Sequence, residues 1–171
     1  MAIEMMYRTL GRRFWASALD FLVLFPLIGL EGTLLESKLS ASAKASLYGA
    51  CVVCTLAYSV VMHWRFGATL GKQATGVRVF NLAGGALLLR QALARDAITI
   101  VLVVCSTIPD LVTIGASRSP EFESDVIASW ASTIILVLEI LTALTNDKRR
   151  SIHDFIAGTV VERDPVPVRT T

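Results

Sequence analysis

Ile98-Thr99-Ile100-Val101-Leu102-Val103-Val104 is a run of residues with no polar face. A helix that is partly exposed to water carries its polar residues on one side, with a period of about 3.6 residues. A soluble helical bundle therefore does not account for this run. The composition of the 171-residue chain agrees, because 54% of the residues are hydrophobic, 18% are charged and the mean hydropathy is +0.62. The sequence predicts a helix that lies in a membrane.

Four apolar stretches of the chain are long enough to cross a membrane, which takes about 20 mostly apolar residues in a helix. They cover about residues 14–34, 45–64, 97–116 and 126–145. Pro26 and Pro109 lie inside two of them, and membrane helices tolerate proline because neighbouring groups satisfy the freed backbone carbonyl. We expect an all-α membrane protein: a four-helix transmembrane bundle that forms a single domain of residues 1–164, followed by a disordered tail of residues 165–171.

The basic residues predict the orientation of this bundle. The segment before the first stretch, the loop of residues 65–96 and the tail after residue 146 hold 13 of the 16 Lys and Arg residues. Positive charge gathers on the cytosolic side of membrane proteins, so both termini and the central loop are predicted to be cytosolic, in a multi-pass protein of the cell membrane. The net charge of +2 is too small to indicate nucleic acid as a partner.

The predicted cytosolic segments carry some structure of their own. Gly67–Lys72 resembles a phosphate loop, but the spacing is one residue short and Gln73 stands where Ser or Thr binds magnesium, so no nucleotide or other cofactor is expected. Two short β-compatible runs, at residues 77–80 and 86–89, surround a Gly-Gly turn and predict a β-hairpin. A third run at residues 158–162 is expected to join its sheet, and residues 90–96 are expected to lead into the third span as an interfacial helix.

Three stretches of this chain resemble the RDD family of membrane proteins. They are Gly11-Arg12-Arg13-Phe14-Trp15-Ala16-Ser17-Ala18-Leu19-Asp20, Gly67-Ala68-Thr69-Leu70-Gly71-Lys72-Gln73-Ala74-Thr75-Gly76-Val77-Arg78-Val79 and Arg149-Arg150-Ser151-Ile152-His153-Asp154-Phe155-Ile156-Ala157-Gly158-Thr159-Val160-Val161. The family is named for one arginine and two aspartates, which by position are Arg13 or Arg12, Asp20 and Asp154. The resemblance implies an α-helical membrane fold, with transport suggested as its function and cation/proton antiport proposed for some members.

The acidic residues inside the predicted spans are candidates for an ion or proton site, because a carboxylate is costly in the hydrocarbon layer. Asp20 lies about 10 Å beyond Arg13 along its helix, and Glu139 lies about 12 Å from the cytosolic end of its own. With His63 near the same side, these residues could form one site in which two carboxylates share a proton or bind a cation. Asp110 is instead expected near the outer end of the third span.

Structural roles remain open for the same residues. Arg13 and Asp154 would form an ion pair that pins the C-terminal segment to the first helix, and that segment has an amphipathic pattern through Ile152, Phe155 and Ile156. Asp20 would then only accept hydrogen bonds; its candidate donors are Arg12, Ser17 and Thr142. His63 would be an interfacial histidine.

Three classes of function follow from these patterns. A transporter would exchange a monovalent cation or small solute for protons through Asp20, and four helices leave so little room for a path that a homodimer is expected. A non-transporting scaffold or assembly factor would instead bind partner proteins or anionic lipids through its cytosolic surface. An enzyme is the weakest class, because the sequence shows no clustered metal ligands and no nucleophile beside His153 and Asp154.

Overall fold

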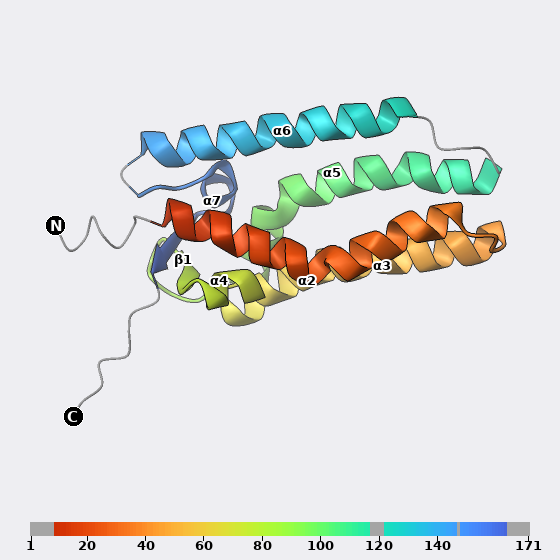
Figure 1. Ribbon diagram of the computed structural model, residues 1–171. Helices are drawn as coiled ribbons and strands as arrows, with labels where there is room; N and C mark the ends of the chain where they lie inside the picture. The colour runs from red at the N-terminus through yellow and green to blue at the C-terminus, as the bar shows by residue number, and fades with distance from the viewer. Residues whose placement is uncertain (1–8, 117–121, 147, 164–171) are drawn as a thin grey trace.

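The computed structural model describes residues 9–116, 122–146 and 148–163 (Figure 1). Four long helices lie side by side in this part of the chain. They are α2 (Leu10–Glu36), α3 (Ala41–Phe66), α5 (Leu89–Ala116) and α6 (Phe122–Thr145). Four short elements gather at one end of the bundle, which we call the capped end: α4 (Leu70–Ala74), β1 (Val77–Asn81), α7 (Ile152–Ala157) and β2 (Thr159–Arg163).

Three of the long helices have the length and composition of membrane spans: Leu10–Leu34 of α2, the whole of α3, and Leu89–Gly115 of α5. Most of their large apolar side chains face outward, as they do when lipid is the solvent. In α6 the apolar part of the described chain, Ser129–Thr145, is shorter than in these three helices. Three of the four predicted spans are therefore found, and the fourth stays a prediction.

Both prolines are accommodated within long helices, and α3 begins and ends with recognisable caps. α2 continues through Pro26 and α5 through Pro109. The Ser40 hydroxyl accepts a hydrogen bond from the backbone of Ala43 at the start of α3, and Gly67 ends that helix with a φ of 66°, a conformation that favours glycine. α3 packs most extensively against α5, and Tyr48, Val52 and Ile114 form a buried cluster between them.

The predicted small sheet is present, but the predicted hairpin between residues 77–80 and 86–89 is wrong. β1 pairs with β2 in antiparallel register from Val77 opposite Arg163 to Asn81 opposite Thr159. Residues 81–85 do form the predicted turn, which the Asn81 side chain holds by accepting from the backbone of Ala83 and Gly85. Beyond the turn, however, the chain enters α5 at Leu89 instead of returning along β1. The third predicted run thus supplies the partner strand.

Packing explains this choice of partner. Val77 and Val79 of β1, Val161 of β2 and Leu87 form a buried apolar cluster at the capped end. The alternating valines of β1 point to one face, so that face needs an apolar cover. Val161, which is opposite Val79, extends this apolar face onto β2, and Leu87 from the connection packs against it. The cluster ties together two segments that are far apart in the sequence.

Candidate functional site

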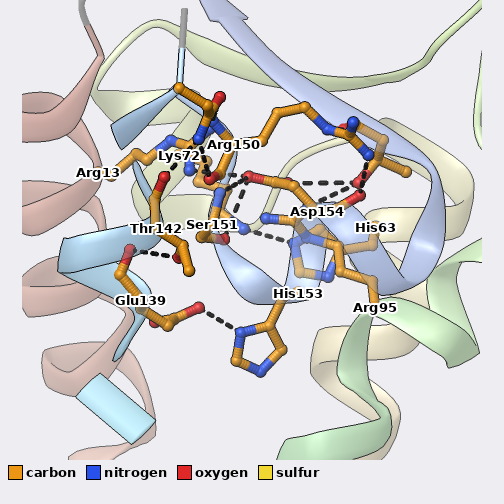
Figure 2. A network of polar contacts seen from close by, with 12 residues as sticks. Arg13, His63, Lys72, Arg95, Glu139, Thr142, Arg150, Ser151, His153 and Asp154 are labelled. Carbon is orange, nitrogen blue, oxygen red and sulfur yellow. Dashed lines mark hydrogen bonds and ion pairs between the residues drawn. The ribbon is translucent and has the colours of Figure 1, made fainter. Parts of the chain in front are cut away.

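Asp154 lies at the centre of a buried network at the capped end (Figure 2). Its carboxylate is fully buried and pairs with Arg13 of α2 at 2.9 Å and with Arg95 of α5. The backbone N–H of Ser151 also donates to it, because Ser151 and Asp154 form the capping box of α7. Burial by itself raises the pKa of Asp154, but the two guanidinium groups outweigh it and hold this pKa well below its ordinary range.

The Asp154 network also binds the sheet. Arg95 donates to the hydroxyl of Thr159 at 3.0 Å, and Arg150 donates from Nε to the Thr159 carbonyl at 2.9 Å. Arg150 also donates from Nη2 to the Asp154 carbonyl. The network therefore joins α2, α5, α7 and the start of β2 at one point. The sequence-derived hypothesis of an ion pair between Arg13 and Asp154 matches this geometry.

Asp20 caps α4 at a second point of contact. Its carboxylate accepts hydrogen bonds from the Tyr58 phenol at 2.8 Å, the Thr69 hydroxyl at 2.5 Å and the Gly71 backbone N–H at 2.8 Å. Gly71 approaches α2 so closely that a Cβ there would overlap the backbone carbonyl of Ala16. Asp20 thus fixes the start of α4 against α2.

The donors to Asp20 are not those predicted from the sequence. Arg12 donates to the Thr75 carbonyl, Ser17 donates to the Arg13 carbonyl, and Thr142 donates to carbonyls of its own helix. The carboxylate points toward α3 and α4 instead, where Tyr58 and Thr69 meet it.

Lys72, His63 and Asp96 form a third group, which we call the His63 chain. The His63 ring is only 3% exposed; its Nε2 lies 2.6 Å from Lys72 Nζ and its Nδ1 lies 3.2 Å from Asp96 Oδ2. An ammonium group has donors and no acceptor, so Nε2 accepts the lysine proton and Nδ1–H donates to the carboxylate. The three side chains form a continuous line of hydrogen bonds from α4 through α3 to α5.

The lysine of this chain titrates near neutrality. Burial, assisted by the positive charge of Arg95, lowers the pKa of Lys72 to about 7. A proton can therefore leave the group or return to it at physiological pH, which an ordinary lysine does not do. In the sequence, Lys72 belongs to the rejected phosphate-loop pattern. Its capacity to bind and release a proton depends on its place beside His63 in the fold.

Glu139 pairs with His153 and has no contact in common with Asp20. The Glu139 carboxylate bonds to Nδ1 of His153, which α7 presents to α6 (Figure 2). The structure thus gives the two candidate carboxylates separate partners on different helices and does not bring them into a single site. Within the described ranges, no three His, Cys, Asp or Glu residues gather as ligands for a metal ion.

A polar pair also lies at the end of the bundle opposite the cap. The Tyr48 phenol of α3 donates to Asp110 of α5, and the Thr107 side chain hydrogen-bonds to the same phenol. Glu31 of α2 lies close enough to interact with Asp110 electrostatically. Asp110 is therefore at the end where it was predicted, while Tyr48 was not singled out in the sequence.

Sequence reasoning missed Arg95 and Asp96 because it placed the start of the third span at residue 97. Residues 90–96 were predicted to be helical, which α5 confirms by beginning at Leu89. They were expected to lie at the membrane interface, however, whereas α5 buries Arg95 and Asp96. A signal was available: the two charged residues directly adjoin the long apolar run that begins at Ala97.

Long apolar helices capped by a buried polar network define a membrane protein with several helices. The sequence profile of the RDD family matches residues 7–158, nearly the whole chain. The chain therefore belongs to the RDD family. Arg12, Arg13, Asp20 and Asp154, the residues proposed as the family signature, all lie inside the matched range. Comparisons with curated proteins and with solved structures gave no match.

Proposed function

We propose that this protein transports a monovalent cation or small solute across the cell membrane in exchange for protons, and that the His63 chain is its proton-binding group. One observation carries this proposal: a lysine with a pKa of about 7 is hydrogen-bonded to a buried histidine, which is hydrogen-bonded to a buried aspartate. Buried ionisable groups in membrane helices are costly, and they commonly mark the pathways of ions and protons.

The net charge of the His63 chain supports an exchange of protons for cations. With Lys72 protonated, the ammonium group and the Asp96 carboxylate together are neutral, and His63 carries no charge. When the proton leaves, the carboxylate stays without a compensating charge in this group, since Arg95 is already paired with Asp154. A monovalent cation would restore neutrality. Proton and cation would therefore compete for one site, as antiport requires.

Asp20 fits this function less well than the His63 chain. Three donors already hold its carboxylate, and one of them is a backbone N–H at the start of α4. An incoming cation would compete with these donors for the carboxylate oxygens, and displacement of the Gly71 N–H would release α4 from α2. We therefore assign Asp20, Arg13 and Asp154 to the assembly of the capped end.

Reconstitution into liposomes that contain a pH-sensitive dye tests the proposal. We expect an imposed Na⁺ or K⁺ gradient to change the internal pH with the wild-type protein, and we expect Asp96→Asn and His63→Gln to abolish the change. His153→Gln is the matched control, because it removes another histidine of the capped end, a partly buried one that is paired with Glu139. An unchanged rate in Asp96→Asn, or no pH change with the wild type under any cation gradient, would contradict the proposal.

A scaffold is the second candidate, and the surface of α7 favours it. Phe155 and Ile156 are about half exposed there, and the guanidinium of Arg150 lies 4.2 Å from the Phe155 ring. Such an apolar and basic surface suits a partner protein or anionic lipid headgroups. Purification in mild detergent would then return a stoichiometric partner that Phe155→Ser releases, and the liposomes would show no ion-dependent pH change.

A further inference from the structure

The interface between α3 and α5 carries polar groups along its length. On α3, Tyr48, Thr55 and Ser59 follow one another at intervals of seven and four residues, so they lie on one face of the helix. This is the face that meets α5, because Tyr48 and Val52 pack against Ile114. His63 continues the line one turn further, at the capped end.

The facing side of α5 is polar near the two ends of this interface. Asp96 lies beside His63 at the capped end, and Asp110 lies beside Tyr48 at the opposite end. Thr107 lies one turn inward from Asp110 and is 91% buried, and its side chain hydrogen-bonds to the Tyr48 phenol. Together these residues form what we call the polar seam: Tyr48, Thr55, Ser59 and His63 of α3 with Asp96, Thr107 and Asp110 of α5.

Thr55 is the unusual member of the polar seam. Its hydroxyl oxygen is fully buried and has no hydrogen-bond partner among the residues that the structure describes. A threonine in a helix ordinarily bonds back to a carbonyl of the preceding turn. A buried hydroxyl without a partner is costly compared with a methyl group of the same shape. Stability alone would therefore favour valine at this position.

We propose that the polar seam conducts the protons of the proposed exchange, with the Thr55 hydroxyl as its central step. This inference rests on the proposed function and adds the route. Along α3, Thr55 is about 6 Å from the level of Ser59, at 1.5 Å per residue. Thr107 lies one turn inward from the Tyr48 level, so its level and that of Thr55 are about 6 Å apart along the helix axes. One water molecule with two hydrogen bonds of about 2.8 Å spans such a distance.

Proton movement along this route needs no redox partner and no permanent change in any side chain. The Thr55 hydroxyl accepts a proton from the water on one side and releases its own proton to the water on the other side, and rotation then restores its starting orientation. Ser59 exchanges the proton with the His63 chain, since its hydroxyl lies 3.5 Å from His63 Nδ1. Lys72 gives its proton to Nε2 while Nδ1–H gives its own proton to the Ser59 hydroxyl, and the reverse shift returns a proton to Lys72. At the other end, Asp110 and Tyr48 accept or release the proton.

The variant Thr55→Val separates conduction from structure. Valine keeps the shape and removes the hydroxyl, so we expect the thermal unfolding midpoint to stay the same or rise, while the proton flux in dye-loaded liposomes falls by about tenfold or more. Thr55→Ser keeps the hydroxyl and should keep the flux. Thr133→Val on α6 is the matched control, because its hydroxyl is exposed and bonded to its own helix.

Each outcome of this experiment bears on the seam. Wild-type flux in Thr55→Val would overturn the seam while the proposed exchange stands, whereas absence of flux in the wild type would overturn the exchange itself. Loss of folding in Thr55→Val would show that the hydroxyl serves stability and would also overturn the seam. As a second variant, Asp110→Asn keeps an acceptor for Tyr48 but cannot release a proton, and we expect it to lower the flux by about tenfold or more as well.

Discussion

Asp154 shows how a single buried charge holds the capped end together. A buried carboxylate is tolerated when opposite charges and hydrogen bonds compensate its lost hydration. Here Arg13 and Arg95 provide the charges, and Ser151 provides both a backbone and a side-chain donor. The stabilisation is mutual, because both guanidinium groups would be left without this carboxylate if it were neutralised.

We therefore expect Asp154→Asn to be strongly destabilising. Removing one partner of a buried ion pair costs about 3–5 kcal/mol, because the remaining charges stay buried and uncompensated. Denaturant unfolding in detergent, followed by circular dichroism, measures the free energy. Glu36→Gln is the control, since Glu36 is exposed at the end of α2. A loss no larger than that of the control would show that the Asp154 network contributes little.

Lys72 makes a pH-dependent contribution of opposite sign to that of a lysine whose pKa is raised by an ordinary ion pair. Its folded-state pKa is lowered to about 7 from 10.5, so between these values the unfolded chain binds a proton that the folded chain has released. Stability must then rise with pH across this window, and the penalty for burying the charge is complete below pH 7. We expect the unfolding midpoint of the wild type to rise from pH 7 to 10 relative to Lys72→Met.

The control for this titration is Lys38→Met, because Lys38 is exposed in the connection between α2 and α3. Its midpoint should follow that of the wild type across the same range of pH. A parallel course for Lys72→Met and the wild type would show that Lys72 keeps an ordinary pKa.

At the scale of the elements, α4 depends on its contact with α2. Any side chain at position 71 would meet the Ala16 carbonyl and the Asp20 carboxylate, and the carbonyl belongs to a helix backbone that cannot yield locally. We expect Gly71→Ala to cost about 1–3 kcal/mol by overpacking. Gly29→Ala on α2 should not destabilise, since a Cβ there meets nothing within 4 Å. Equal unfolding free energies for the two variants would contradict this account.

Local patterns predicted the elements better than their partners. The apolar runs gave α2, α3 and α5, because a membrane helix satisfies its backbone within one segment. The alternation of Val77 and Val79 predicted β1 correctly. Its partner strand, however, lies more than 70 residues further along the chain, and no local pattern contains that pairing. The turn at Gly84 and Gly85 therefore suggested a neighbouring strand where a helix follows.

The candidate site shows the same limit. Asp20, Arg13 and Asp154 stood out in the sequence because charge is rare beside apolar runs, and the pairing of Arg13 with Asp154 could be inferred. The His63 chain could not, because its members come from three elements and Lys72 gains its unusual pKa only from burial. Counting residues along each helix predicted the same membrane depth for Asp20 and Glu139. It did not predict which neighbouring element each side chain faces.

For the molecule as a whole, the sheet restricts the path of the chain through the membrane. β1 precedes α5 and β2 follows α6, yet the two strands pair at the capped end. If α5 crosses the membrane away from this end, α6 must cross back to return β2 to β1. Likewise, Arg13 at the start of α2 meets Asp154 beyond α6. We therefore expect α6 to be the fourth span, although its apolar run is short.

Reporter fusions test this expectation. With four spans and the basic capped end in the cytosol, a fluorescent protein that matures only in the cytosol should be bright at either terminus. Alkaline phosphatase, which is active only outside the cytosol, should be inactive when fused after residue 171 and active when inserted at residue 38, in the connection between α2 and α3. An active phosphatase at the C-terminus with a bright N-terminal fusion would mean an odd number of spans. β1 and β2 would then lie on opposite sides of the membrane, and neither their pairing nor the Arg13–Asp154 contact could form.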